Sequence, residues 1–456
     1  MRRSFLVIIV IVLTCATYAQ DESLTLEDCI KLALKKNAAI ITNQNLNESS
    51  DRDVLASYAG ILPTLNVSAS SGKFKAGESE DFSEVPVEID SVTGDPIRLE
   101  RRLITRPSDK GSFNEFNLRL NQNLFDGGEW WNAIRYAQAQ KRASDYNLIS
   151  IINTTVMTVQ ERFFDLLKQQ KLLEVNELAV KRSEDQLSKT EKMYELGAVA
   201  KVDVFRSRVN LGNDRTELLL QKNAVITARN VLNLSLGRNP NSPLRIQHEF
   251  SLKSAFKNTE ELIETAIEKN PELMKTEEEV KASDIAVARS YSVLFPNLSA
   301  FLNYRRSNEE INRVYTNYNK NWTLNYGLSV SLNLFNGFQD MVNIQKSKLA
   351  ERNNQVAFEE SKRELIASVL QLVDNYNSYL EIIEINEENL EAAKEEFRLA
   401  EERYRIGSGT QLEVREAQVN LTRAEQTLVA AQYNARITQA QLEQALGTIY
   451  AAGEED

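Results

Sequence analysis

The sequence predicts an α+β membrane protein made of two structural repeats, each with long coiled-coil-like helices and two β-strands. Three observations predict this fold class: a helical hairpin pattern, its recurrence later in the chain, and four segments of alternating hydropathy. The hairpin pattern fills residues 129–236, which contain no proline and have glycine only at positions 197 and 212. About 68 residues can therefore form one helix before the first break, with a length of roughly 100 Å.

An apolar residue recurs at every seventh position along this predicted helix. The positions are Ile152, Val159, Leu166, Leu173, Val180, Leu187 and Tyr194. This spacing is typical of the contact line of a left-handed coiled coil, so the helix is expected to pack lengthwise against a partner. A second line of the same spacing follows the break at residues 196–198: Val204, Leu211, Leu218, Val225 and Leu232. Together they predict a long helical hairpin.

The hairpin pattern returns later in the chain at a constant offset of 210 residues. The Asn-Leu-Phe-Asp-Gly of residues 123–127 returns as Asn-Leu-Phe-Asn-Gly at 333–337, and Tyr194 and Gly197 return as Tyr404 and Gly407. Such a constant offset indicates two structural repeats. We place them at residues 20–237 and 238–456, each beginning with a helix. The helical hairpins occupy residues 129–236 and 338–447, and a short C-terminal tail follows the second.

Residues 1–19 have the features of a secretory signal peptide. Arg2 and Arg3 precede an apolar run at residues 5–13, and small residues lie at the cleavage positions before Gln20. The alternative is a lipoprotein signal that uses Cys15 as the lipidated residue, although the preceding residue fits that motif poorly. With the preferred cleavage site only Cys29 remains, so no intramolecular disulfide is expected.

Composition argues against an enzyme and against a nucleic-acid-binding protein. Without the signal the chain carries 52 Lys and Arg against 65 Asp and Glu, a formal charge of −13, which does not suit nucleic acid. His248 stands alone, and there is no Cys/His cluster or Gly-rich phosphate loop, so we expect no catalytic residues, no metal and no cofactor. No later apolar run reaches 18 residues, so we expect no membrane-spanning helix.

Apolar and polar residues alternate strictly for 13 residues from Trp322 to Leu334. This pattern predicts one strand with an apolar and a polar face. Weaker alternation, broken once at Phe301, predicts three more strands, so that the four predicted strands lie at about residues 64–74, 113–125, 297–305 and 322–335. Residues 74–112, which include Pro86 and Pro96, are expected to form a long loop, and residues 306–320 its shorter counterpart.

Alternation alone fits a small covered sheet as well as a membrane barrel. The strands of roughly 9–13 residues are long enough to cross a bilayer, and their polar faces are almost uncharged, which favours a barrel with apolar residues facing lipid. Four strands cannot close a barrel, and an open edge is not tolerated in lipid. The barrel is therefore expected to be shared between subunits, with the long helices continuing it as a tube.

The order and spacing of these motifs resemble the TolC family of outer-membrane efflux proteins. The resemblance rests on the starts of two strands (Leu62-Pro63-x-Leu65 and Phe295-Pro296-x-Leu298), the two Asn-Leu-Phe-x-Gly joints and the two Tyr-x-x-Gly tips, and covers essentially the whole chain after the signal. It implies a homotrimer in the cell outer membrane, with a 12-stranded β-barrel in outer-membrane lipid and a periplasmic α-barrel. It also implies two partners, a periplasmic adaptor protein and an inner-membrane transporter.

The resemblance places the functional residues at the hairpin tips. It implies adaptor contacts at Gly197, Ala198, Val199, Gly407, Ser408 and Gly409. Small residues there also let another helical tip approach the backbone closely. The alternative is that the glycines only terminate helices.

The resemblance also implies an entrance constriction and a latch. Glu413 and Glu416 align with acidic residues that ring the constriction, although two glutamates in so acidic a chain also fit a solvated helix face. Asp203 and Tyr404 match an acid and a tyrosine that hold the entrance shut. The arginine often found in this latch is absent, because its position holds Gly409; Arg206, Arg405 or Arg415 are the candidates to replace it.

The resulting functional prediction is a passive exit duct of a tripartite efflux or type I secretion system. The alternative from another class is a secreted coiled-coil scaffold with a small β head and no channel, which would purify without detergent. The sequence does not choose between drugs, metals and proteins as the exported substrate, because the pump selects it.

Overall fold

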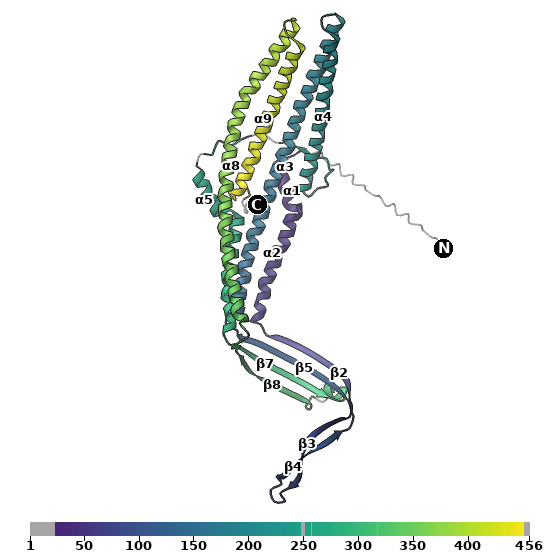
Figure 1. Cartoon of the computed structure of the whole chain (residues 1–456), viewed down its shortest axis with the longest axis vertical. Coiled ribbons are helices and arrows are strands. Elements are labelled where there is room, and N and C mark those ends of the chain that lie inside the picture. The colour runs from purple at the N-terminus through teal and green to yellow at the C-terminus, as the bar shows by residue number, and fades with distance from the viewer. Residues whose placement is uncertain (1–22, 248–250, 257, 317, 451–456) are drawn as a thin grey trace, which may run out of the picture. The chain divides into compact units, whose positions relative to one another are not determined.

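The computed structural model describes residues 23–247, 251–256, 258–316 and 318–450 (Figure 1). The predicted signal at residues 1–19, including Cys15, and His248 lie outside the described residues. The described chain forms two compact units, one within residues 1–50, 141–279 and 354–456, the other in residues 51–140 and 280–353. It is mostly helical, with some sheet.

The longest helices are α3 (Glu129–Glu195) and α8 (Gln339–Arg405), with 67 residues each. Each is followed by a helix of 35 residues, α4 (Lys201–Ser235) and α9 (Gln411–Ala445). The shorter helices are α1 (Leu26–Lys36), α2 (Ala38–Ser57), α5 (Thr259–Lys269) and α6 (Pro271–Ser290). None of the described helices combines the length and the low charge that a membrane span requires.

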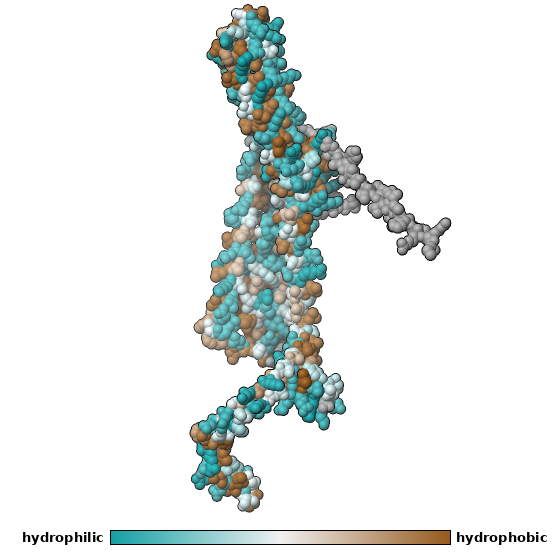
Figure 2. All heavy atoms as spheres, turned by 90° about the vertical axis from the view of Figure 1, so that its right-hand side faces the viewer, coloured by the Kyte–Doolittle hydropathy of each residue, from teal (hydrophilic) through white to brown (hydrophobic). Residues whose placement is uncertain are grey.

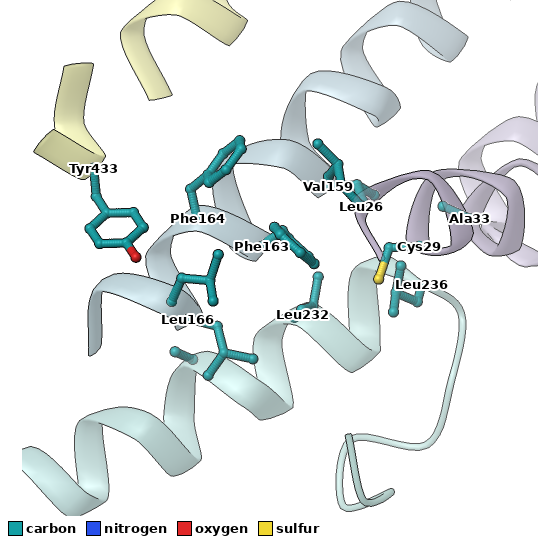
Figure 3. Packing of buried hydrophobic residues seen from close by; sticks show 12 residues of the cluster. Leu26, Cys29, Ala33, Val159, Phe163, Phe164, Leu166, Leu232, Leu236 and Tyr433 are labelled. Carbon is teal, nitrogen blue, oxygen red and sulfur yellow. The ribbon is translucent and has the colours of Figure 1, made fainter. Parts of the chain in front are cut away.

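An apolar cluster holds α1 against the α3–α4 hairpin. Figure 3 shows Phe163 of α3 facing Leu232 of α4, and Cys29 of α1 beside Leu236. These four side chains are fully buried, and Tyr433 of α9 packs against the same cluster. Burial raises the pKa of the Cys29 thiol to about 12, because the thiolate would lose its hydration.

The start of α1 is fixed by a capping box. The Thr25 hydroxyl accepts the Asp28 backbone N–H at 3.2 Å, and the Asp28 carboxylate accepts the Thr25 backbone N–H at 3.1 Å. These bonds satisfy donors that a helix start leaves open. Residues 23–24, just before the cap, form the short strand β1 (Ser23–Leu24), which pairs in parallel with β6 (Arg245–Ile246).

The second unit holds a four-stranded antiparallel sheet in the order β2-β5-β7-β8. Its strands are β2 (Thr64–Ala76), β5 (Asp109–Phe125), β7 (Asn297–Asn308) and β8 (Trp322–Ser331). The register places Leu65 opposite Leu120, Leu120 opposite Leu302 and Leu302 opposite Tyr326. Directly paired residues share a face, so one face of the sheet is apolar across all four strands.

Phe301, which breaks the alternation in the sequence, lies on the other, polar face. Its Cα partners are Asn121 and Gly327. A Cβ atom at Gly327 would come within 3.3 Å of the Phe301 ring. The glycine therefore leaves room for the ring on the polar face, and the pairing register stays regular through this position.

The prediction of a long loop at residues 74–112 is wrong. The structure has a β-hairpin there, made of β3 (Ser79–Ile89) and β4 (Pro96–Arg106), and β2 and β5 extend into the segment from either side. The paired strands explain the difference, since Glu84 lies opposite Arg101 and Phe82 opposite Leu103. The shorter segment at 306–320 contains the helix α7 (Ile311–Thr316).

Candidate functional site at the hairpin tips

Both helical hairpins turn at a glycine with a left-handed backbone. Gly197 (φ 75°) donates its N–H to Tyr194 O at 2.9 Å, and Ala198 donates to Met193 O at 2.8 Å. The second tip repeats these bonds, from Gly407 (φ 79°) to Tyr404 O at 3.1 Å and from the next residue to Arg403 O at 2.9 Å. This is the Schellman ending, which requires the αL conformation that glycine adopts without strain. The glycines do terminate helices, and their role in partner contact stays a prediction.

Apolar side chains are exposed around both tips. At the first tip they are Leu196, Val202 and Phe205, and at the second Ile406 and Leu412. Figure 2 shows hydrophobic side chains among hydrophilic ones at the upper end of the molecule, where Figure 1 shows the tips. The predicted contact residues Gly197, Ala198, Gly407 and Ser408 are exposed beside them, and Val199 and Gly409 are half-buried.

Gly409 packs against the last turn of α8. A Cβ atom at this position would lie 3.1 Å from both Arg403 Cβ and Tyr404 N. Such a contact is tight for any larger residue. The close packing of the second tip therefore leaves little room for the arginine that the resemblance implies at this position.

The two predicted constriction residues differ in their surroundings. Thr410 caps α9 by accepting the Glu413 N–H at 3.3 Å, and the Glu413 carboxylate forms an ion pair with Arg403 at 3.3 Å. Glu416 is exposed one turn further along the helix. Glu413 is thus partly neutralised within the chain, while Glu416 is open to solvent.

Within one chain, the two predicted latch residues, Asp203 and Tyr404, do not bond to each other. Asp203 forms an ion pair with Arg206 at 3.6 Å. Tyr404 is 6% exposed, and its buried hydroxyl has no hydrogen-bond partner among the described residues. The bond between Asp203 and Tyr404 stays a prediction.

Arg415 links α9 to the first hairpin. Its guanidinium donates to both carboxylate oxygens of Asp214 on α4, at 2.7 and 3.0 Å. Ser183 of α3 donates to the same carboxylate, and Gln418 donates to the Ser183 hydroxyl at 2.8 Å. The Arg415 and Asp214 side chains are only 21% and 16% exposed. Of the three candidate arginines, Arg415 therefore connects the two hairpins, whereas Arg206 and Arg405 pair within their own helices.

This network belongs to a polar contact line that sequence reasoning missed. Asn176, Ser183 and Thr190 recur at seven-residue intervals on α3, and all three are buried. Gln411 and Gln418 lie seven apart on α9; Gln411 donates to Ser207 at 2.9 Å. The predicted apolar line is buried at Val159 and Leu166, but its last member, Tyr194, is 43% exposed. The polar residues have the same seven-residue spacing in the sequence, but a heptad pattern of apolar residues does not include them.

A groove of about 580 Å³ lies between α3 and α8 next to the second tip. Lysine and arginine dominate the charged part of its lining. The lining residues are Gln186, Lys189, Lys192, Met193, Arg398, Glu401, Glu402, Tyr404 and Arg405. Lys189 and Glu401 form an ion pair across it at 2.8 Å. The described part of the chain has no cluster of His, Cys, Asp or Glu that could hold a metal ion.

Comparison with known proteins agrees with this geometry. The family model described as outer membrane efflux protein matches residues 29–238 and 262–448. The probable efflux pump outer membrane protein TtgC of Pseudomonas putida is 21% identical over 292 residues, 64% of this chain, and the chain spans 60% of the length of that relative. The outer membrane protein TolC of Escherichia coli is 24% identical over 363 residues, 73% of this chain and 69% of that protein.

A solved structure shows the same fold. The Campylobacter jejuni CmeC outer membrane channel superimposes with a TM-score of 0.79 at 16% sequence identity, over 94% of this chain and 87% of that channel. The matched family segments include both helical hairpins, all four strands of the sheet and both tips. On the strength of that match, this chain belongs to the outer membrane efflux protein family.

Proposed function

We propose that this protein is a passive exit duct in the cell outer membrane, through which an efflux or type I secretion system releases its substrate. The observation that carries the proposal is the sheet β2-β5-β7-β8. Its apolar face is exposed on the edge strands, as at Leu65, Val67, Tyr326 and Leu328. Lipid is the medium in which such a face is stable.

The two edges of this sheet support an assembly of several copies. Strands β2 and β8 lie at the ends of the sheet order, and a membrane-embedded sheet cannot leave its edges open. Pairing of β8 with β2 of the next copy closes the sheet, and three copies give a 12-stranded barrel. The equal lengths of α3 and α8, and of α4 and α9, support two structural repeats that form a periplasmic α-barrel.

The tips are the proposed entrance and partner surface. Exposed apolar residues beside Gly197 and Gly407 suit a periplasmic adaptor protein that docks helix tip against helix tip, with an inner-membrane transporter supplying the energy. Glu413 and Glu416 are the proposed constriction, because threefold symmetry brings six carboxylates together there. Such a ring favours cations over anions.

Single-channel recording in planar bilayers tests the proposal. We expect a detergent-extracted oligomer with a cation-preferring conductance, and a roughly two- to fivefold loss of that preference in Glu413→Gln/Glu416→Gln. The control is Glu391→Gln/Glu395→Gln, which removes two exposed carboxylates of α8 and is expected to keep the preference. A protein that stays soluble without detergent and gives no conductance would instead be the coiled-coil scaffold.

A further inference from the structure

The β3–β4 hairpin separates its charges by strand. Strand β3 carries four acidic residues and no basic one: Glu80, Asp81, Glu84 and Glu88. Strand β4 carries four arginines and one acid: Arg98, Glu100, Arg101, Arg102 and Arg106. All but the half-buried Glu100 are exposed. The hairpin therefore has one acidic edge and one basic edge.

Opposite charges already hold the two strands of one hairpin together. Glu84 lies directly opposite Arg101, Arg106 forms an ion pair with Asp81 at 3.9 Å, and the Arg101 guanidinium lies 5.1 Å from the centre of the Phe82 ring. Favourable cross-strand pairs of this kind are the unit of sheet stability. Each strand uses one backbone edge for this pairing, and its outer edge pairs with no other described strand. Acids lie along β3, and arginines, interrupted once by Glu100, lie along β4.

The β3–β4 hairpin also exposes apolar side chains. Phe82, Ile89, Ile97 and Leu103 are all more than a third exposed. Figure 2 shows hydrophobic side chains among hydrophilic ones at the bottom of the view, where Figure 1 labels β3 and β4. An exposed strand edge with apolar neighbours is a template for pairing with another strand.

We infer that the hairpins of neighbouring copies meet in a head-to-tail ring, with the basic edge of β4 against the acidic edge of β3 in the next copy. Rotational symmetry brings opposite edges of identical elements together, so the charge separation is complementary at every junction. Antiparallel order is also kept, because β4 and the next β3 run in opposite directions. The partner is a second copy of this chain.

The ring would narrow the outer opening of the duct. β3 follows β2 and β4 precedes β5 after only two residues each, so every hairpin continues the β2–β5 pair. In the proposed barrel, β7 and β8 stand between β5 and the next β2, which separates adjacent hairpins by three strand spacings, roughly 14 Å. The hairpins must lean toward the axis to meet, so the exit becomes smaller than the barrel below it.

This inference rests on the proposed function, because it needs the oligomer. The test is a charge-swapped chain in which the four acids of β3 become lysine, the four arginines of β4 become glutamate, and Glu100→Arg is added. Pairing within a swapped hairpin is preserved, and so is pairing between two swapped copies. Only a junction between a wild-type and a swapped copy faces like charges.

Wild-type and swapped chains with different affinity tags are co-expressed, and mixed oligomers are counted by native mass spectrometry. We expect mixed oligomers to fall roughly three- to tenfold below the random distribution, because like charges facing each other across strands are destabilising. The matched control swaps an exposed pair on α8, Glu391→Lys with Lys394→Glu, and is expected to mix randomly. Random mixing of the hairpin-swapped chain would overturn the ring while leaving the oligomeric duct intact. Failure of the wild-type chain to form any oligomer would overturn both.

A second measurement covers a swapped chain that does not assemble. One chain carries Glu84→Cys and a second carries Arg102→Cys, so a disulfide between these sites has to join two chains. We expect cross-linked pairs under mild oxidation when both chains are present, and none when either is expressed alone, because a head-to-tail ring places β3 against β4. Cross-linking of Glu84→Cys with itself, or no cross-linking at neighbouring positions along both edges, would contradict the proposal.

Discussion

The α3–α4 hairpin is packed in opposite ways at two places along its length. Beside α1 it buries an apolar cluster that includes Phe163, Leu166 and Leu232. Closer to the tips it buries Ser183 and Thr190, and it contacts α9 through hydrogen bonds and ion pairs. The same helices thus pass from an apolar contact to a polar one.

The apolar and the polar contact differ in the free energy needed to separate them. Apolar side chains that part are exposed to water at a cost that grows with their area. Polar side chains that part exchange their partners for water, so each hydrogen bond contributes little net free energy. Removing only one partner of a buried ion pair is expensive, because the other charge is left without a partner. Separating α9 from α3 and α4 near the tips would therefore cost less than separating α1 from the base of the first hairpin.

The largest expected effect is in the apolar cluster. Phe163→Ala leaves a cavity at a fully buried position, so we expect a loss of about 3–5 kcal/mol in the free energy of unfolding. Circular dichroism of the detergent-solubilised protein measures it as a lowered unfolding midpoint. Leu178→Ala, at a half-exposed site of the same helix, is the control and is expected to cost less than about 1 kcal/mol. Equal losses from both variants would remove the contrast.

The polar contact responds differently to Arg415→Gln. The change leaves the Asp214 carboxylate, 16% exposed, without its two charged hydrogen bonds, which are worth about 1.5–3 kcal/mol. We expect faster amide hydrogen exchange in residues 176–190 and 411–425, no change around Phe163 and a larger conductance. Arg398→Gln removes an exposed arginine whose ion pairs within the described residues are with glutamates of α8, and it serves as control. Faster exchange throughout the first unit would show that Arg415 supports the whole unit rather than the tips.

The sequence allowed much of the backbone to be predicted, because local patterns determine it. The absence of proline over residues 129–196, the tip glycines and the alternation from Trp322 onward are properties of short segments. The β3–β4 hairpin was missed for the opposite reason. Its charges and Pro86 look like a loop when each strand is read alone, and they become favourable only when Glu84 meets Arg101 across the pair.

The candidate site also has one part that local sequence determines and one part that depends on tertiary contacts. The tip turns follow from Gly197 and Gly407, whereas the partners of the arginines depend on which helices meet. Nothing in the spacing of Arg415 and Asp214 along the chain, 201 residues apart, indicates their bond. The Tyr404 hydroxyl has no hydrogen-bond partner among the described residues, and neither its position in the sequence nor the repeat pattern indicates that.

The smallest expected effect appears at alkaline pH and concerns only the apolar cluster. Burial raises the pKa of Cys29 from 9.0 to about 12, so the folded protein keeps its thiol proton at a pH where the unfolded chain loses it. This contribution to stability is complete below about pH 9 and is lost between pH 9 and 12, at about 1.4 kcal/mol per pH unit. Between pH 9 and 10 the wild-type unfolding midpoint should therefore fall more steeply than that of Cys29→Ala, because alanine has no proton to lose. Other groups titrate in both proteins and cancel in this difference. Parallel pH profiles would mean that the thiol is hydrated in the folded protein and that the cluster around Phe163 is looser than its packing indicates, which would weaken the contrast with the polar tips.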